Sequence, residues 1–146
     1  MVKAIIEIPS GDTIRRHFNK SQNRFIDLGP IKNLIPVNNG VMPVNYGFIP
    51  DTHNPEDNDE LDILVISVDT LSVGQEVETI PIALLKRKDG DDKIVASDTT
   101  LDIKSWEDIE FDLRESMLNF FGYKSGIIAI GSKDETEQYI EKGKHF

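Results

Sequence analysis

Short apolar runs separated by polar breaks dominate the chain, and most of them are too short to be helices. Runs of four to ten residues rich in Val, Ile and Leu, bounded by Gly, Pro, Asn or Asp, are typical of β-strands. We expect strands at residues 4–8, 45–49, 62–67, 76–85, 93–97 and 126–130. Asp89-Gly90 lies between two of these runs and indicates a hairpin turn.

Two segments near the carboxyl end have helical spacing. In the first, Ser105 is the expected N-cap, and the apolar stripe comprises Trp106, Ile109, Leu113, Met117 and Phe120. The second covers residues 133–142, with Ser132 and Glu135 placed as a capping box. Several short strands with only two helices predict a mainly β fold with α (α+β), built as a small barrel rather than a parallel sheet.

The composition is that of one ordinary domain. The chain has 146 residues, 38% of them apolar, so we expect a single domain over residues 1–146 with one core. The absence of cysteine excludes disulfides, thiolate metal sites and cysteine nucleophiles. The first apolar run is too short for a signal peptide, and no stretch reaches the length of a membrane span. We therefore expect a cytoplasmic protein with no membrane partner.

The charge balance argues against nucleic acid as a partner. Twenty-six acidic residues against sixteen Lys and Arg give a formal net charge of −10. The basic run Lys86-Arg87-Lys88 leads directly into Asp89, so the bases are not segregated into a patch. A small polyanion remains a possible ligand if divalent cations mediate the contact.

One acidic segment stands directly before an apolar strand. Asp57, Asp59 and Asp62 are followed by Ile-Leu-Val-Ile, which holds the loop at one end. Carboxylate clusters of this kind suit Mg²⁺, Mn²⁺ or Ca²⁺, although a solvated acidic loop has the same appearance. An EF-hand is excluded, because Asp62 and Val68 occupy the positions that require Gly and Glu. Neither a P-loop nor a Gly-x-Ser-x-Gly elbow occurs.

The order of several motifs along the chain is more specific than any one of them. These motifs are Glu7-Ile8-Pro9, Pro43-Val44-Asn45-Tyr46-Gly47-Phe48-Ile49-Pro50, Asp57-x-Asp59-x-x-Asp62, Asp89-x-Asp91-x-Lys93 and Phe120-Phe121-Gly122-Tyr123-Lys124. Their succession resembles the soluble (family I) inorganic pyrophosphatases over essentially the whole chain. The resemblance implies a five-stranded OB-like barrel flanked by two helices, Mg²⁺-dependent (or Mn²⁺-dependent) hydrolysis of pyrophosphate, and a homo-oligomer.

The resemblance also implies a role for each matching position. Asp57, Asp62 and Asp91 match ligands of the principal metal pair, while Asp89 and Glu7 match ligands of the metal that arrives with the substrate. Asp59 matches the general base. Tyr46 matches a tyrosine near the nucleophile, and Lys93, Tyr123, Lys124 and Arg15 match groups that hold the phosphates.

Several positions depart from the family pattern. Glu60 replaces the proline of the acidic signature, and His17 stands where a glutamate is expected. Arg15 takes the place of a lysine, Leu34 that of an arginine, and Met42 that of a tyrosine. The metal ligands are thus retained while part of the phosphate-binding set is changed.

Three alternatives to a pyrophosphatase remain open at this point. The first is a hydrolase of another phosphoanhydride or phosphoester, and the second is a metal-binding homologue of low activity. The third, a non-catalytic OB-fold binder of nucleic acid, requires a basic groove with exposed aromatics, which the charge pattern disfavours.

Overall fold

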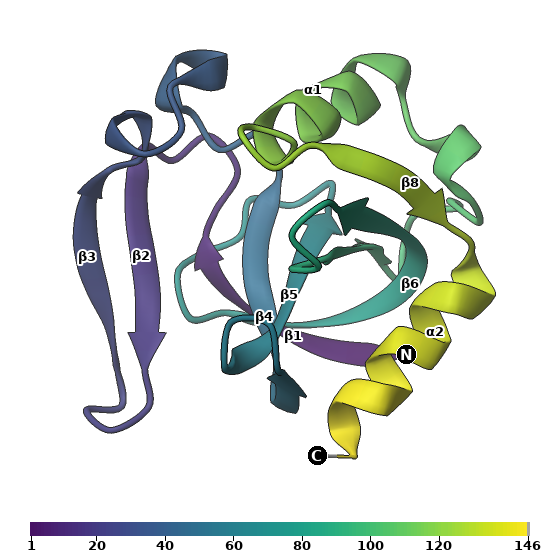
Figure 1. Cartoon of the computed structure of the whole chain (residues 1–146), viewed down its shortest axis with the longest axis horizontal. Coiled ribbons are helices and arrows are strands. Elements are labelled where there is room, and N and C mark those ends of the chain that lie inside the picture. Colours follow the sequence, from purple (N-terminus) through teal and green to yellow (C-terminus); the bar gives the residue numbers. More distant parts are fainter. Residues whose placement is uncertain (146) are drawn as a thin grey trace.

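In the computed structural model, which describes residues 1–145, five strands close into a barrel (Figure 1). In pairing order they are β1 (Val2–Ile8), β4 (Asn45–Asn54), β5 (Asp59–Ile66), β7 (Lys93–Asp98) and β6 (Glu76–Arg87). The pairing of β6 with β1 closes the ring, and only the β5–β7 pair within it is parallel. A further strand, β8 (Ile127–Gly131), pairs with the end of β6. The predicted mainly β fold with a five-stranded barrel and two helices is confirmed.

A separate hairpin stands beside the barrel and was not predicted. It consists of β2 (Ile14–Asn19) and β3 (Arg24–Pro30), and two short 3₁₀ turns follow it, η1 (Ile31–Asn33) and η2 (Val37–Gly40). Neither hairpin strand contains a buried residue. In sequence, their apolar residues are interrupted by charged ones such as Arg15, Arg16 and Asp27, so no clear strand pattern marks these two segments.

The first helix begins later than its sequence pattern predicts. Ser105 precedes only a 3₁₀ turn, η3 (Trp106–Asp108), and its side chain makes no capping hydrogen bond. Ile109 then takes an extended conformation and is buried in the core, which breaks the helical run. Helix α1 (Phe111–Phe121) starts after it and buries Met117, Phe120 and Phe121.

The second helix follows its prediction closely. Helix α2 (Lys133–Lys144) is capped by Ser132, whose hydroxyl accepts from the Glu135 backbone N–H, while the Glu135 side chain accepts from the Ser132 N–H. This is the predicted capping box. Neither α-helix within residues 1–145 has the length and apolar character needed to cross a membrane.

Alternation along β5 gives the barrel wall two different faces. Ile63 and Val65 belong to the core cluster that includes Ile140 of α2, whereas Leu64 belongs to the cluster of α1. Because side chains alternate along a strand, Asp62 lies on the same face as Leu64. Lys93 is the direct neighbour of Asp62 in the parallel β5–β7 pair.

One glycine, Gly47 on β4, allows β1 and β4 to approach closely. A Cβ atom on Gly47 would lie 2.1 Å from the carbonyl oxygen of Ile5, which no other residue type tolerates. The register of the β1–β4 pair shifts just beyond this point, between Ile6 and Ile8. Glu7 therefore sits at a bulge, and bulges are a common way to redirect a side chain.

Candidate active site

The loop between β4 and β5 is fixed by its own polar side chains. The Asp57 carboxylate accepts from the Asp59 backbone N–H at 3.1 Å, and the Asp59 carboxylate accepts from the Glu60 N–H at 2.9 Å. Asn58 adopts a positive φ of 56°, which Asn tolerates better than most residues. Thr52 on β4 links the two strands that flank the loop, because its hydroxyl accepts from the Leu61 N–H on β5. The acidic loop is thus a built structure that presents its carboxylates in defined directions.

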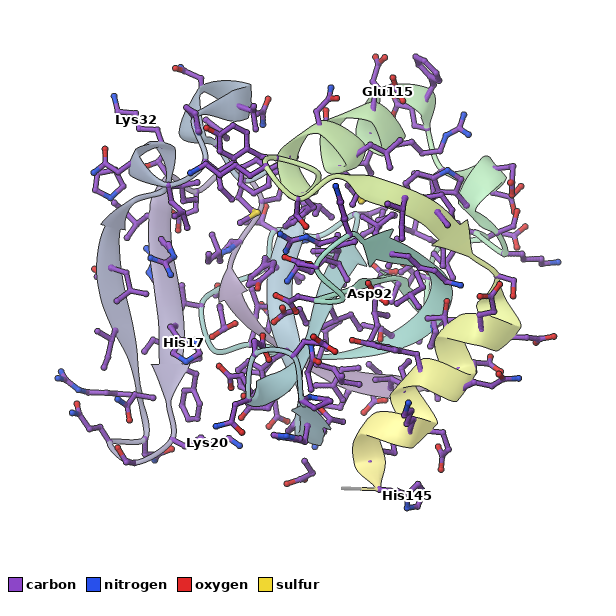
Figure 2. All side chains as sticks on the ribbon, in the orientation of Figure 1. His17, Lys20, Lys32, Asp92, Glu115 and His145 are labelled. Carbon is purple, nitrogen blue, oxygen red and sulfur yellow. The ribbon has the colours of Figure 1, made fainter. Side chains whose placement is uncertain are left out.

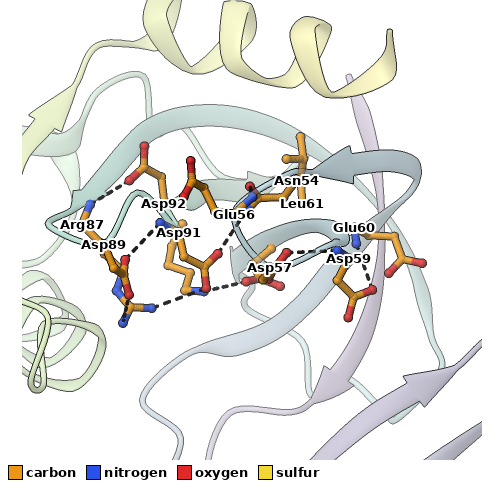
Figure 3. Close-up of polar contacts among 12 residues, drawn as sticks. Asn54, Glu56, Asp57, Asp59, Glu60, Leu61, Arg87, Asp89, Asp91 and Asp92 are labelled. Carbon is orange, nitrogen blue, oxygen red and sulfur yellow. Dashed lines mark hydrogen bonds and ion pairs between the residues drawn. The ribbon is translucent and has the colours of Figure 1, made fainter. Parts of the chain in front are cut away.

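The turn between β6 and β7 brings a second set of carboxylates to the same place. Gly90 has a φ of +81°, and the Gly90 N–H donates to the Arg87 carbonyl, so the predicted Asp89-Gly90 turn is confirmed. The Asp89 carboxylate accepts from the Asp91 N–H. The Asn54 amide on β4 donates to the Asp91 carboxylate at 3.0 Å and so links the turn to the other loop (Figure 3).

Lys93 and Asp62 form the buried floor between the two turns. The Lys93 Nζ lies 2.5 Å from Asp62 Oδ2 and 3.1 Å from Asp91 Oδ2. Burial raises the pKa of Asp62, although Lys93 partly offsets the effect. Burial lowers the pKa of Lys93, but Asp62 and Asp91 outweigh it and raise the value overall. One ammonium group therefore holds two carboxylates.

Three of these aspartates are arranged as a cation would require. One carboxylate oxygen each from Asp57, Asp62 and Asp91 lies within 4.8 Å of the others. Partial desolvation of its carboxylate, followed by repulsion from Asp91 and Asp62, raises the pKa of Asp57 to about 6. Oxygen donors of this kind are those that hard divalent cations prefer. The residues present therefore fit a divalent metal, whose charge would offset the repulsion.

A second group of contacts joins Glu7 to Asp59 through the hairpin. Glu7 is only 4% exposed, and burial, then the nearby carboxylates, raise its pKa to about 8 against the opposing Phe18 N–H bond. The two ring nitrogens of His17 lie 3.6 Å from the Glu7 carboxylate and 3.1 Å from that of Asp59. Figure 2 shows His17 and Lys20 on the side of β2 that faces the barrel. Lys20 pairs with Glu60 at 2.7 Å.

Tyr46 lies between the charged floor and the apolar core. Its ring stacks on Phe121 at 6.0 Å between centroids, and the Lys93 ammonium lies 6.0 Å from the same ring. Burial, followed by repulsion from Asp62 and Glu7, raises the pKa of the Tyr46 hydroxyl. The phenol is therefore kept as a neutral hydrogen-bond donor beside carboxylates.

All the residues singled out from the sequence line one cavity of about 740 Å³. They are Glu7, Arg15, Tyr46, Asp57, Asp59, Asp62, Asp89, Asp91, Lys93, Tyr123 and Lys124. Arg16 and His17 of β2 also line this cavity, and Arg16 is paired with Asp12. The individual roles of these residues stay predictions, but a shared cavity is what those roles require.

Sequence reasoning missed several groups in this cavity. Arg87 lies 3.1 Å from the Asp89 carboxylate and 3.8 Å from that of Asp91, and these contacts were hidden because Arg87 belongs to a basic run. Its position two residues before the acidic turn was the available signal. Ser125, whose hydroxyl accepts from the Asp89 N–H, gave no signal, because its position next to the turn depends on the end of α1.

A family model described as "Pyrophosphatase: Inorganic pyrophosphatase" matches residues 4–143 of the chain. The chain belongs to the inorganic pyrophosphatase family. The members of this family are hydrolases that use divalent metals, and the aspartate cluster described above suits such a metal.

Individual members of the family agree with this assignment. The inorganic pyrophosphatase of Sulfolobus acidocaldarius is 35% identical over 131 residues, which cover 83% of this chain and 72% of that protein. The one from Aeropyrum pernix is also 35% identical, over 66% of this chain, and there the match spans only about half (53%) of the relative. The crystal structure of the Ehrlichia chaffeensis inorganic pyrophosphatase superposes with a TM-score of 0.85 at 27% identity, covering 97% of this chain and 91% of that one.

Proposed function

We propose that this protein hydrolyses inorganic pyrophosphate to two phosphates with Mg²⁺, or Mn²⁺ in its place, as cofactor. The observation that carries the proposal is the convergence of Asp57, Asp62 and Asp91 beside Lys93 in one cavity. Membership of the family supports the substrate, and the carboxylate donors support a hard divalent cation.

The metal sites would be built from carboxylates on β1, the β4–β5 loop, β5 and the β6–β7 turn. Asp57, Asp62 and Asp91 would hold the principal metals, with Asp89 and Glu7 as further ligands for a metal that enters with the substrate. When bound, divalent cations lower the pKa of water and neutralise charge on the phosphates. The buried Glu7 carboxyl, whose pKa is about 8 in this structure, would ionise most readily beside such a cation.

Asp59 is the proposed general base. Asp59 is the first residue of β5, between Asp57 of the preceding loop and Asp62 of the same strand, and its carboxylate is held by the Glu60 N–H and the His17 ring. An acceptor in that position takes a proton from the attacking water as the new bond to phosphorus forms. Tyr46, kept protonated by its surroundings, would donate a hydrogen bond near the nucleophile.

Four cationic or hydroxyl groups would hold the phosphates. Lys93 is buried at the floor, and Arg15, Tyr123 and Lys124 also line the cavity. Positive groups of this kind stabilise the charge that builds on the leaving phosphate. A cytoplasmic location and assembly into a homo-oligomer are further proposals, which rest on the absence of cysteine and on the family.

Phosphate release from a panel of substrates tests the proposal. Pyrophosphate, tripolyphosphate and sugar phosphates are each offered with Mg²⁺, with Mn²⁺ and with a chelator. We expect pyrophosphate to be cleaved in the presence of either metal and not in the chelator. Turnover of a sugar phosphate without turnover of pyrophosphate would contradict the proposed function.

A further inference from the structure

One side of the cavity is apolar, and pyrophosphate has no group to place there. Leu28, Ile31, Leu34, Ile35, Met42 and Phe121 line this side, here called the apolar wall. Ile31, Met42 and Phe121 belong to the core cluster of α1, and Ile35 packs against it. Part of the wall therefore belongs to the core, and Leu28 and Leu34 are its most exposed residues.

The wall carries more apolar surface than the fold needs. Leu34 is 48% exposed and Leu28 is 45% exposed, although both border a cavity. Exposed apolar side chains gathered at one place commonly mark a site of binding. A cavity of about 740 Å³ is also in the range used for organic ligands, which is about 300–1,000 Å³.

The apolar wall adjoins the residues that are proposed to bind the phosphates. Tyr46 stacks on Phe121 with one face and contacts the charged floor through Lys93. Tyr123 and Lys124 follow Phe121 after a single glycine, Gly122, just beyond the end of α1, which lies beside η2 in Figure 1. A phosphate held by Lys124 would thus lie in a cavity that is lined by both the acidic cluster and the apolar wall.

We propose that the apolar wall accommodates the organic group of an organic diphosphate, so that the site also cleaves the phosphoanhydride bond of such esters. This inference rests on the proposed function, because the same type of phosphoanhydride bond is broken and the same residue, Asp59, acts as the base. The terminal phosphate lies at the acidic cluster, and the phosphate that carries the organic group lies at Tyr123 and Lys124.

The reaction balances as a simple hydrolysis. The oxygen of water forms a bond to the terminal phosphorus while the bond from that phosphorus to the bridging oxygen breaks. The electron pair leaves with the bridging oxygen, and Asp59 receives the proton of the water. The products are inorganic phosphate and an organic monophosphate, and nothing is oxidised or reduced.

The test compares kcat/KM for three substrates of the full chain with Mg²⁺: pyrophosphate, a nucleoside diphosphate and a branched five-carbon alkyl diphosphate. Phosphorus NMR identifies the monophosphate product. We expect at least one organic diphosphate to be cleaved with a kcat/KM within about tenfold of that for pyrophosphate. The two organic substrates distinguish a nucleoside from an alkyl group as the better occupant of the wall.

Variants of the wall make the test specific. Leu34→Asn should lower kcat/KM for the organic substrate by about tenfold or more and change that for pyrophosphate by about twofold at most. Leu28→Asn is a second variant at an equally exposed position. The matched control is Ile128→Asn, since Ile128 on β8 is 67% exposed and does not line the cavity. Circular dichroism verifies that each variant is folded.

The outcomes separate this inference from the proposed function. Cleavage of pyrophosphate but of neither organic diphosphate overturns the inference and leaves the proposed function standing. Equal losses for both substrate types in both leucine variants also overturn it. Cleavage of an organic diphosphate without pyrophosphate supports the inference and contradicts the proposed substrate, whereas no cleavage of any substrate overturns both.

Discussion

Asp59 differs from the other aspartates of the cavity in its surroundings. It does not belong to the group of three whose oxygens lie within 4.8 Å, and its carboxylate instead contacts His17 and the Glu60 N–H. Asp62, in contrast, is buried and paired with Lys93. These two aspartates can therefore be separated experimentally, one as a base and the other as a metal ligand.

The first prediction compares two substitutions of equal size. Asp59→Asn should lower kcat for pyrophosphate by about 10²- to 10⁴-fold, because general-base catalysis contributes about that much. Its half-saturating Mg²⁺ concentration should rise much less than that of Asp62→Asn, which serves as the matched control. Isothermal titration calorimetry of metal binding checks this prediction. An equal loss of metal affinity in both variants would show that Asp59 is an ordinary metal ligand.

At the level of elements, the β2–β3 hairpin forms one side of the site. Phe18 stacks with Phe25 and Phe48, which attaches the hairpin to the barrel. Its backbone N–H donates to Glu7, and Lys20 in the hairpin turn reaches Glu60. Glu60 occupies the place of the proline expected in the acidic signature. The Lys20–Glu60 ion pair therefore links the hairpin to the acidic segment, and a proline at position 60 could not make this contact.

The second prediction tests this tie. Lys20→Ala should lower the free energy of unfolding by about 1 kcal/mol, a modest value because Lys20 is 67% exposed and water screens the pair. Lys20→Arg should retain most of it. In the Lys20→Ala background, Glu60→Gln should cost less than it costs in the wild type. Urea unfolding of the wild type, Lys20→Ala, Glu60→Gln and the double variant measures the coupling energy between Lys20 and Glu60. Additive losses would show that the ion pair contributes nothing to stability.

The elements that sequence could predict are those whose own residues carry the pattern. The segments 45–49, 76–85 and 93–97 lie within observed strands, because these strands bury side chains in the core. The hairpin strands escaped prediction because they bury none, and α1 was predicted too early because Ile109 reaches the core in an extended conformation.

The features of the site also fall into those that the sequence could predict and those that it could not. Its carboxylates and lysines could be selected from motif order, and all of them line the cavity. The partners of these groups could not, since the Lys20–Glu60 and His17–Asp59 contacts depend on how the hairpin docks. Such contacts join segments that are distant in sequence, so no local pattern records them.

At the level of the whole molecule, the cavity concentrates negative charge in a chain whose net charge is already −10. Desolvation and the neighbouring carboxylates give Glu7 a pKa of about 8 and Asp57 a pKa of about 6, both above the ordinary values of 4.5 and 3.8. At pH values between the ordinary pKa values and the raised ones, the folded protein therefore binds more protons than the unfolded chain. The free energy of unfolding must then fall as the pH rises through this range.

The third prediction follows from this sign. In a chelator, the free energy of unfolding should drop by a few kcal/mol between about pH 5.5 and about pH 8, and Mg²⁺ should restore much of it at the higher pH. Glu7→Gln should flatten the pH dependence, because it removes the group with the largest shift. Urea unfolding at the two pH values checks this. A metal-free protein that is more stable at the higher pH would contradict the prediction.

The most direct test of the central claim is the Mg²⁺ dependence of phosphate release from pyrophosphate, measured for the wild type and Asp91→Asn. Asp91 contributes an oxygen to the three-aspartate group and also contacts Lys93 and Asn54. We expect no release in a chelator and a saturating rise with Mg²⁺ in the wild type. Asp91→Asn should shift the half-saturating concentration upward by about tenfold or more. Equal turnover with and without chelator, or the same Mg²⁺ curve for both proteins, would contradict the claim that these carboxylates hold the catalytic metal.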